Sequence, residues 1–258
     1  MKGILDLTPP LADARIAYGD APQQFGDLRI PKGMAAGARA PVAMVIHGGY
    51  WRSAYGLEHI GHACAALTRA GVATWNIEYR RIGDAGGGWP GTGDDALRGA
   101  EALPMLAQSY PLDLARVVVV GHSAGGQLAL WLAAQHKIGL RGVVSLAGVA
   151  DLRRAWDLRL SRGAVAELLG GTPETQAERY HEASPMELLP IGVPERLLHG
   201  VKDDVVPVDM SRRFQGAAVA AGDDSRLTEI PDAGHFDLID PRTHAWTRVE
   251  AAVMDLLK

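Results

Sequence analysis

Residues 117–135, VVVVGHSAGGQLALWLAAQ, constrain the fold of this chain more than any other stretch. Four consecutive valines are typical of a strand buried on both faces, and the apolar residues that follow the turn recur at helical spacing. Between the two lies GHSAG at 121–125, a turn of small residues with one hydroxyl at its centre. A strand that enters a helix through so tight a turn predicts an α/β fold with Ser123 exposed at the corner.

Strand-like and helix-like patterns alternate along most of the chain. Strands are expected at 15–19, 25–31, 42–46, 72–79, 116–120, 142–148, 196–200 and 226–230, and helices at 57–70, 94–109, 123–135, 208–221 and 243–257. Continuous apolar strands separated by helices indicate a mostly parallel central sheet with helices on both faces. A chain of 258 residues can form one such unit, so we expect a single α/β domain over residues 1–258.

One segment interrupts this alternation. Residues 151–192 contain three short helical patterns, DLRRAWDLRL, GAVAELLG and PETQAERYHE, between two strands that could be joined directly. Proteins of the α/β class place functional loops after sheet strands, so an insertion there predicts a small helical lid. The alternative is an ordinary crossover helix with additional turns.

Charge and composition restrict the partners of the chain. It has 26 Lys and Arg residues against 30 Asp and Glu residues, a formal charge of −4 with both signs mixed along the sequence. No basic stripe is available to follow a phosphate backbone, so nucleic acid is not an expected partner. The first twenty residues lack both the apolar core of a signal peptide and a membrane span, which predicts a cytoplasmic protein with no membrane partner.

The GHSAG turn has the arrangement of a catalytic nucleophile. Gly121 and Gly125 let the strand and the helix close around the turn without clashes from a Cβ atom. The strained turn lifts the Ser123 hydroxyl out of the core and brings the N–H of Ala124, at the helix start, to the same place as an oxyanion donor. The alternative is a tight turn in which Ser123 only caps the helix.

A second glycine motif, HGGYW at 47–51, directly follows the strand at 42–46. Glycines let backbone N–H groups approach a substrate oxygen closely, where side chains would obstruct it. We therefore expect Gly48 and Gly49 to be oxyanion donors, with Tyr50 as a further candidate. The alternative is an ordinary glycine turn between a strand and a helix.

A serine nucleophile needs a histidine base and an acid that orients the base. The strand at 196–200 runs into VKDDVVP, which offers Asp203 and Asp204, and the strand at 226–230 runs into PDAGHFDLID, which offers His235. The order along the chain is then serine, acid, histidine. Both aspartates are candidates at this point, and the alternative for each of these residues is a solvated loop position.

With HGGYW, GHSAGG, HGVKDDVVP and AGHFDLID in place, the chain resembles the α/β-hydrolase superfamily over residues 41–258. Its HGGYW loop is similar to that of the kynurenine formamidase (arylformamidase) family, within the HGG-motif esterases. The resemblance implies an α/β-hydrolase fold with Ser123 as nucleophile, His235 as base and Asp203 as acid, with Asp204 in reserve. The stretch EYRRIGDAGGGWPGTGDD departs from a formamidase signature and looks more like a broad set of bacterial esterase-type hydrolases.

The resemblance also implies a small-molecule acyl substrate. The expected activity is hydrolysis of N-formyl-L-kynurenine to kynurenine and formate, a step of tryptophan catabolism. Four aromatic residues are candidates for the wall that binds the leaving amine: Tyr50, Trp51, Trp89 and Trp156. A carboxylesterase acting on short-chain acyl esters would use the same catalytic residues. The alternative from another class is a non-catalytic binding protein with this fold, which fold alone does not exclude.

No cofactor and no metal are expected. GTGDDA at 91–96 fits a dinucleotide motif in part, but it does not directly follow a strand, and its two aspartates would repel a pyrophosphate. His59 and His62 lack a convincing third metal ligand. The single cysteine, Cys64, lies in a helical pattern and is expected to be a core residue. The oligomeric state is left open, a homodimer included.

Overall fold

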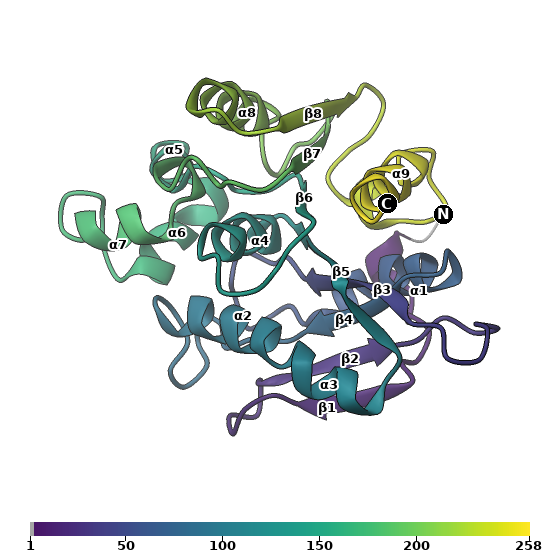
Figure 1. The fold of residues 1–258 in the computed structure, drawn as a ribbon. Coiled ribbons are helices and arrows are strands. Elements are labelled where there is room, and N and C mark those ends of the chain that lie inside the picture. Colours follow the sequence, from purple (N-terminus) through teal and green to yellow (C-terminus); the bar gives the residue numbers. More distant parts are fainter. Residues whose placement is uncertain (1–2) are drawn as a thin grey trace.

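The computed structural model describes residues 3–258, and its centre is a twisted eight-stranded sheet (Figure 1). The strands are β1 Ala14–Ala17, β2 Phe25–Arg29, β3 Ala40–Ile46, β4 Ala73–Ile77, β5 Leu112–His122, β6 Gly142–Leu146, β7 Glu195–Gly200 and β8 Ser225–Ile230. They lie in the order β1-β2-β4-β3-β5-β6-β7-β8. The pairs β1–β2 and β2–β4 are antiparallel and the remaining pairs are parallel, so the predicted mostly parallel sheet is confirmed.

Alternate residues of the central strands enter two separate cores, one on each face of the sheet. In β3, Val42, Met44 and Ile46 belong to one core, whereas Ala43 and Val45 belong to the other. All five are buried. Because successive side chains of a strand point to opposite faces and both faces are covered, the strand has to be apolar at every position. This explains the unbroken valine run in β5.

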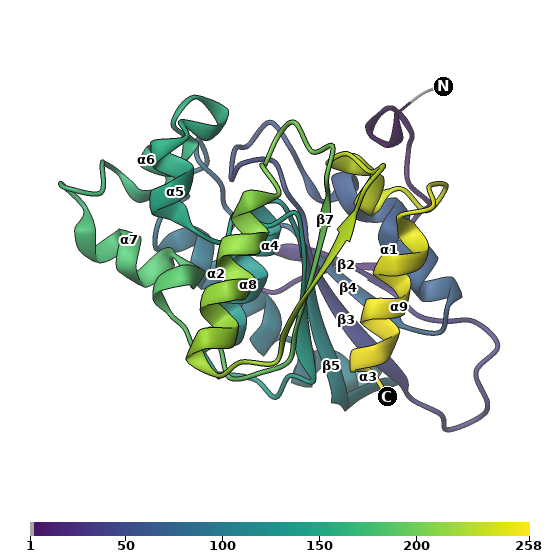
Figure 2. The same ribbon diagram turned by 90° about the horizontal axis from the view of Figure 1, so that it is seen from above.

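Helices cover both faces of the sheet. They are α1 Gly61–Arg69, α2 Gly91–Glu101, α3 Leu103–Ser109, α4 Ala124–Ala134, α5 Leu152–Asp157, α6 Ala164–Leu169, α7 Ala177–Ala183, α8 Asp209–Ala221 and α9 Trp246–Leu256. α1 and α9 lie on one face, and α2, α3, α4 and α8 lie on the other (Figure 2). The helix expected at 94–109 is divided into α2 and α3 near Pro104, which has no N–H to continue the helical hydrogen bonds.

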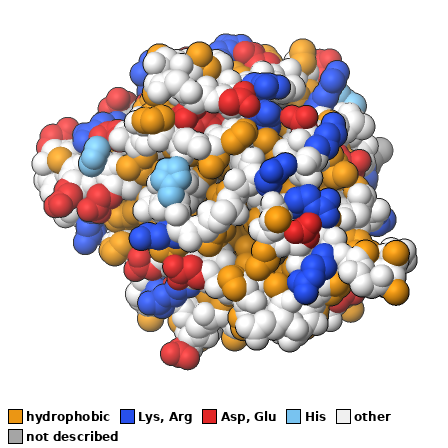
Figure 3. Space-filling model, viewed as in Figure 1, with side chains coloured by type: hydrophobic (Ala, Val, Ile, Leu, Met, Phe, Trp, Pro, Cys, Tyr) orange, Lys and Arg blue, Asp and Glu red, His pale blue; other side chains and the backbone are white. Residues whose placement is uncertain are grey.

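Between β6 and β7 the chain forms the helical insertion that the sequence predicts at 151–192. It comprises α5, α6 and α7 with 3-10 turns at Leu160–Arg162 and Pro185–Glu187. Its inner residues, such as Val165 and Tyr180, are buried in the same core as α4. Its outer surface, at the left of Figure 3, carries many charged side chains. The insertion is therefore packed onto the domain from one side only, and its action as a lid stays a prediction.

The parallel strands place their carboxyl ends at one edge of the sheet. The loops that follow β3, β5, β7 and β8 contain the four motifs singled out in the sequence. Side chains from these loops therefore meet at this edge, where open α/β sheets hold their ligands.

Candidate active site

Ser123 stands in the turn between β5 and α4 with a positive φ of 58° and a ψ of −119°. This conformation is costly for a non-glycine residue and persists only where the surroundings enforce it. A Cβ on Gly121 would lie 1.9 Å from the Gly125 carbonyl oxygen, and one on Gly125 would lie 2.1 Å from the Ile46 carbonyl oxygen. The predicted need for glycine on both sides of the serine is therefore confirmed.

Backbone hydrogen bonds tie this turn to the end of the neighbouring strand. The Ser123 N–H donates to the Leu146 carbonyl at 2.8 Å, and the Val149 N–H donates to the Ser123 carbonyl at 3.2 Å. Ser123 is only 2% exposed, yet it lines a cavity of about 550 Å³ at this edge of the sheet. The turn thus presents the serine to an enclosed space.

His235 follows β8 and lines the same cavity as Ser123. Its Nδ1 lies 2.6 Å from Oδ2 of Asp203. Since a carboxylate can only accept, Nδ1 carries the proton and Nε2 of the neutral ring is an acceptor. Within residues 3–258 this Nε2 has no hydrogen-bond partner. The ring is therefore oriented by the aspartate and free to take a proton from another group.

The structure distinguishes the two aspartates, of which the family resemblance implied Asp203 as the acid and Asp204 as the reserve. The Asp203 side chain is fully buried, whereas Asp204 is exposed. Oδ1 of Asp203 accepts hydrogen bonds from the N–H groups of Val205 and Val206, both at 2.8 Å. Of the two aspartates, only Asp203 contacts His235 in the part of the chain described.

His199, which the sequence analysis left out of the site, lies beneath the acid. Its Nε2 is 3.3 Å from Oδ2 of Asp203, and its Nδ1 is 2.7 Å from the Ser211 hydroxyl. Burial by itself would raise the pKa of Asp203, but hydrogen bonds with His199, His235 and the Val206 N–H lower it well below its ordinary value. Asp203 is therefore an anion throughout the neutral pH range.

The loop after β3 runs against the serine turn. Gly49, Tyr50 and Trp51 all have positive φ, at 110°, 51° and 56°. A Cβ on Gly48 would lie 3.0 Å from Cβ of Ser123, so the two turns touch. Gly49 lines the cavity together with Ser123.

Three backbone N–H groups near the serine have no hydrogen-bond partner among the described residues: those of Gly48, Gly49 and Ala124. N–H groups in the interior of proteins are nearly always paired, so this cluster has the capacity to bind an acceptor from outside the chain. Their role as oxyanion donors stays a prediction, which this geometry supports.

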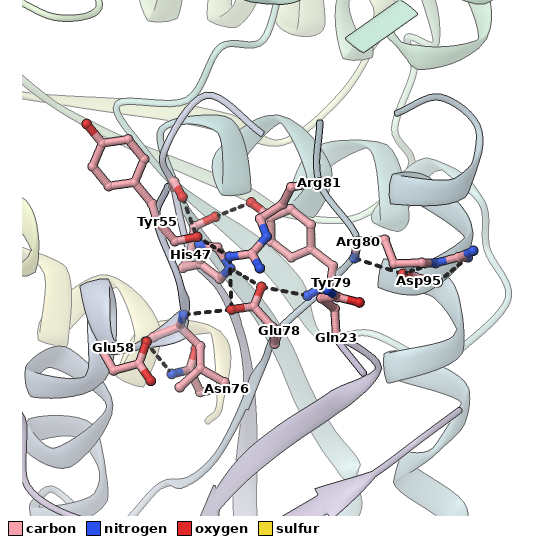
Figure 4. A network of polar contacts seen from close by, with 12 residues as sticks. Gln23, His47, Tyr55, Glu58, Asn76, Glu78, Tyr79, Arg80, Arg81 and Asp95 are labelled. Carbon is pink, nitrogen blue, oxygen red and sulfur yellow. Dashed lines mark hydrogen bonds and ion pairs between the residues drawn. The ribbon is translucent and has the colours of Figure 1, made fainter. Parts of the chain in front are cut away.

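A buried ionic network, which was not among the features expected from the sequence, lies beneath this loop (Figure 4). His47 Nε2 lies 2.8 Å from Oε1 of Glu78, and His47 Nδ1 lies 2.7 Å from the Gly48 carbonyl oxygen. Both partners are acceptors, so the ring of His47 is held between two oxygen atoms. The other Glu78 oxygen accepts from Arg81 Nη1 at 3.2 Å and from the Leu57 N–H at 3.1 Å. Glu78 thus holds the first residue of the glycine loop.

The charges and hydrogen bonds of this network favour the ionised form of Glu78. Burial alone would raise the pKa of Glu78, but the charge and hydrogen bond of His47 and the charge of Arg81 lower it. Tyr79 stacks on His47 with ring centroids 4.5 Å apart, and its hydroxyl donates to the His47 carbonyl at 2.9 Å. One feature of the sequence could have indicated this network: the tripeptide EYR directly follows an apolar strand. A carboxylate at the end of a buried strand is costly unless it is paired.

Two further histidines connect the serine turn to the loop of His235. His122 Nε2 is 3.0 Å from the His235 carbonyl oxygen, and His122 Nδ1 is 3.0 Å from His59 Nε2. Burial and the neighbouring histidines lower the pKa of His122 well below its ordinary value and that of His59 to about 3. Both rings are therefore neutral, so His59 donates to His122 and His122 donates to the His235 carbonyl.

The expected aromatic wall is largely wrong. Of its four residues only Tyr50 lines the cavity. Trp51 is fully buried, and its indole N–H donates to Gln127 at 2.9 Å. Trp89 is packed in the core, where its ring meets Trp131 edge to face at 5.1 Å.

Trp156, the fourth expected wall residue, lies beside a separate hollow in the insertion. The aromatic residues that accompany Tyr50 at the cavity are Tyr55 and Phe236. The prediction of these tryptophans as cavity residues failed because a tryptophan buries more apolar area in the core than at a cavity rim. Sequence position does not distinguish a core tryptophan from one at a rim.

The remaining expectations concern metals, membranes and the cysteine. Residues 3–258 contain no group of three or more His, Cys, Asp or Glu that could hold a metal ion. None of the helices in this described range combines the length and the apolar character needed to cross a membrane. Cys64 is a buried core residue as predicted, and burial raises the pKa of its thiol to about 12.

Several of the named proteins to which this chain is similar are esterases. Esterase LipC of Mycobacterium tuberculosis (strain ATCC 25618 / H37Rv) is 27% identical over 283 residues, which cover 92% of this chain and 67% of LipC. A truncated carbohydrate esterase from gut microbiota superposes with a TM-score of 0.81 at 19% identity over 99% of both chains. The propionate-bound esterase Est2 of Thermogutta terrifontis has a TM-score of 0.75 at 20% identity, over 95% of this chain and 93% of Est2. At such identities the two structures show the fold alone.

Taken with the site, the similarity to Esterase LipC defines the class: the protein is an enzyme, a serine hydrolase of the α/β-hydrolase superfamily. The model of the BD-FAE family matches residues 27–217, about three quarters of the chain. The chain belongs to the BD-FAE family.

Proposed function

We propose that this serine hydrolase is a carboxylesterase that cleaves esters of small acyl groups, with Ser123 as nucleophile, His235 as base and Asp203 as orienting acid. The observation that carries the proposal is the 2.6 Å contact between His235 Nδ1 and Asp203, which leaves Nε2 free at the cavity that Ser123 also lines. A base with this tautomer is what a serine nucleophile requires.

The mechanism follows from these positions. His235 Nε2 takes the hydroxyl proton as Ser123 Oγ attacks the ester carbonyl carbon, and Asp203 stabilises the imidazolium that forms. The carbonyl oxygen becomes an oxyanion, which the N–H groups of Gly48, Gly49 and Ala124 can receive. The C–O bond to the alcohol then breaks, and His235 returns its proton to the departing oxygen. Water repeats the sequence on the acyl-enzyme and releases the carboxylic acid.

The size of the acyl group is inferred from the relatives and the cavity. Est2 has been solved with propionate and with butyrate bound, which indicates short acyl chains for that esterase. The cavity volume of about 550 Å³ is in the range of small-molecule sites. Esters of two to four acyl carbons are therefore the first substrates to test.

Hydrolysis of N-formyl-L-kynurenine is the second candidate. The HGGYW loop favours it, and a formyl group needs little space on the acyl side, so the aromatic amine would lie against Tyr50, Tyr55 and Phe236. The same three catalytic residues would act, with an amine in place of the alcohol as leaving group.

The test compares p-nitrophenyl acetate, propionate and butyrate with N-formyl-L-kynurenine. We expect kcat/KM of about 10⁴ M⁻¹s⁻¹ or more for the best ester. A fluorophosphonate should also label Ser123, as detected by peptide mass spectrometry. Faster hydrolysis of the formamide than of every ester would make the protein an arylformamidase. Absence of turnover and of labelling would contradict both candidates and favour a non-catalytic binding protein.

A further inference from the structure

The described lining of the cavity at Ser123 contains a basic residue but no acidic one. No Asp or Glu lies among its described lining residues, and the single Lys or Arg among them is Arg52. Asp203 is buried behind His235 and is paired with it. A substrate that enters this space therefore meets one cation among the lining residues, and the carboxylate of Glu167 that pairs with this cation is not part of the lining.

Arg52 has hydrogen-bond donors that the protein does not use. Its Nη2 donates to Glu167 Oε1 at 2.7 Å and to the Ser161 carbonyl at 3.1 Å. Its Nε and Nη1 have no partner among residues 3–258, and Nε is shielded from solvent. A guanidinium presents five N–H groups, so the two of Nη2 are satisfied, whereas the two of Nη1 and the shielded one of Nε are not.

Backbone hydrogen bonds fix the main chain of Arg52, and the contacts of Nη2 fix its side chain. The Arg52 N–H donates to the Gly49 carbonyl at 3.1 Å, so Arg52 closes the same turn that contains the expected oxyanion donors. The residues on either side of Arg52 are also bound: the Ile82 N–H donates to the Trp51 carbonyl at 2.7 Å, and the Ser53 N–H donates to the Ile82 carbonyl at 3.2 Å. A donor group that is already positioned loses little conformational freedom when a ligand binds.

A purely structural role would account for only part of these observations. The contacts to Ser161 and Glu167 attach the insertion to the glycine loop, and both are made by Nη2 alone. A role in attaching the insertion does not use Nη1, which stays unpaired on a residue that lines the cavity.

We propose that Arg52 selects substrates that carry a carboxylate in addition to the scissile acyl bond, by pairing its free Nη1 N–H groups with that carboxylate. The proposal rests on the esterase function proposed above. Nη1 carries two N–H groups, and a hydrogen bond from a guanidinium to a carboxylate is charge-assisted, which makes it about twice as strong as a neutral one. Arg52 acts here as a specificity residue and takes no part in bond breaking.

Two pairs of substrates test the proposal and locate the carboxylate. 4-Acetoxybenzoate and its methyl ester place the charge or its neutral counterpart on the leaving group. 4-Nitrophenyl hydrogen succinate and 4-nitrophenyl butyrate place it on the acyl group. The readout is the ratio of kcat/KM for the charged member to that for the neutral member. Arg52→Gln should lower this ratio by about 10- to 100-fold for at least one pair.

Two control variants separate substrate binding from attachment of the insertion. Glu167→Gln removes the same ion pair but leaves the Arg52 charge, so the ratio should be kept or increased. Arg162→Gln removes an arginine that lines a different hollow and should leave the ratio unchanged. An unchanged ratio in Arg52→Gln, or an equal loss in Glu167→Gln, would overturn the proposal.

A binding measurement tests the role of Arg52 independently of esterase activity. If the wild type hydrolyses no ester, the esterase function fails, and calorimetric binding of 4-hydroxybenzoate and its methyl ester decides the role of Arg52. Carboxylate-dependent binding that is lost in Arg52→Gln would support the role. Equal binding of both compounds to the wild type and the variant would contradict it.

Discussion

Two regions of this molecule hold non-glycine residues at positive φ, but in opposite surroundings. Next to the cavity they are Tyr50, Trp51 and Ser123, at 51°, 56° and 58°, and in the insertion they are Arg159, Ser161 and Arg162, at 50°, 46° and 58°. The serine turn is enclosed by backbone, with 1.9 Å between a Cβ on Gly121 and the nearest carbonyl oxygen. Beside the second group, a Cβ on Gly163 would meet nothing within 4 Å.

The comparison teaches that the same backbone strain has different consequences in the two regions. Around Ser123 the packing enforces the conformation, so the nucleophile keeps its position. In the insertion Arg159 and Arg162 are exposed, and the turn is attached to the glycine loop through Arg52 and the Ser161 carbonyl. We therefore expect the glycine loop and serine turn to be the rigid side of the cavity, and the insertion to be its adaptable side.

The largest expected difference lies between two serines that line the same cavity. Ser123→Ala should lower kcat by about 10⁵-fold or more, because the nucleophile is lost. Ser161→Ala, on the insertion, should change kcat by less than about 3-fold, since only its backbone carbonyl makes a contact. Ester hydrolysis by both variants checks this, with thermal unfolding to show that each is folded. Comparable losses in the two would contradict the assignment.

The neighbouring aspartates provide the next contrast. Asp203→Asn should lower kcat by about 10⁴-fold, because the amide no longer holds the required His235 tautomer. Asp204→Asn should have little effect, as its side chain is exposed. The measurement is kcat for the same ester in both variants. A severe loss in Asp204→Asn with an active Asp203→Asn would exchange their roles.

Glycine substitutions test the two turns directly. Gly121→Ala should reduce the free energy of unfolding by about 4 kcal/mol or more, because the new Cβ has no space between backbone atoms. Gly163→Ala has room for its Cβ and should cost only about 1 kcal/mol for its positive φ. Urea unfolding of both variants gives the two values. Similar costs would mean that the two turns are equally rigid.

The network beneath the glycine loop should also respond more strongly than a surface acid. Glu78→Gln leaves His47 and Arg81 without their buried counter-ion and should cost about 3 kcal/mol. Because the pKa of folded Glu78 is lower than its ordinary value of 4.5, this stabilisation is present above that pH and is lost as the pH falls. The Glu78→Gln variant should therefore be less stable at neutral pH, and its free energy of unfolding should fall less than that of the wild type as the pH is lowered.

The matched control for this network is Glu58→Gln, since the Glu58 side chain is 64% exposed and lies nearby (Figure 4). Thermal unfolding between pH 3 and pH 7 compares the two variants. An equal effect of both would show that the buried network contributes nothing specific to the loop.

The smallest effect is expected on the outer face of the insertion. Arg153→Ala removes an ion pair with Glu187 in which both side chains are partly exposed. Such pairs contribute less than about 1 kcal/mol. Thermal unfolding at low and high salt provides the check. A loss above about 2 kcal/mol would show that the insertion is more tightly coupled to the domain than the comparison implies.

Much of the fold and the centre of the site could be predicted from the sequence. Valine runs predict strands buried on both faces, and GHSAG predicts the serine turn, because both patterns depend on local sterics and burial. The resemblance favoured Asp203 over Asp204, and the direction of the two side chains in the structure separates them. His199, Glu78 and His122 were missed because their partners lie on other strands and loops.

The amino-acid sequence by itself determined where the chain alternates between strand and helix and which two turns need glycine, since each of these depends on residues close together in the chain. The tertiary structure decided which histidine and aspartate pair, which tryptophans are core residues and which arginine lines the cavity. Those outcomes depend on contacts between loops far apart in sequence, and in such contacts the direction of a side chain matters as much as its identity.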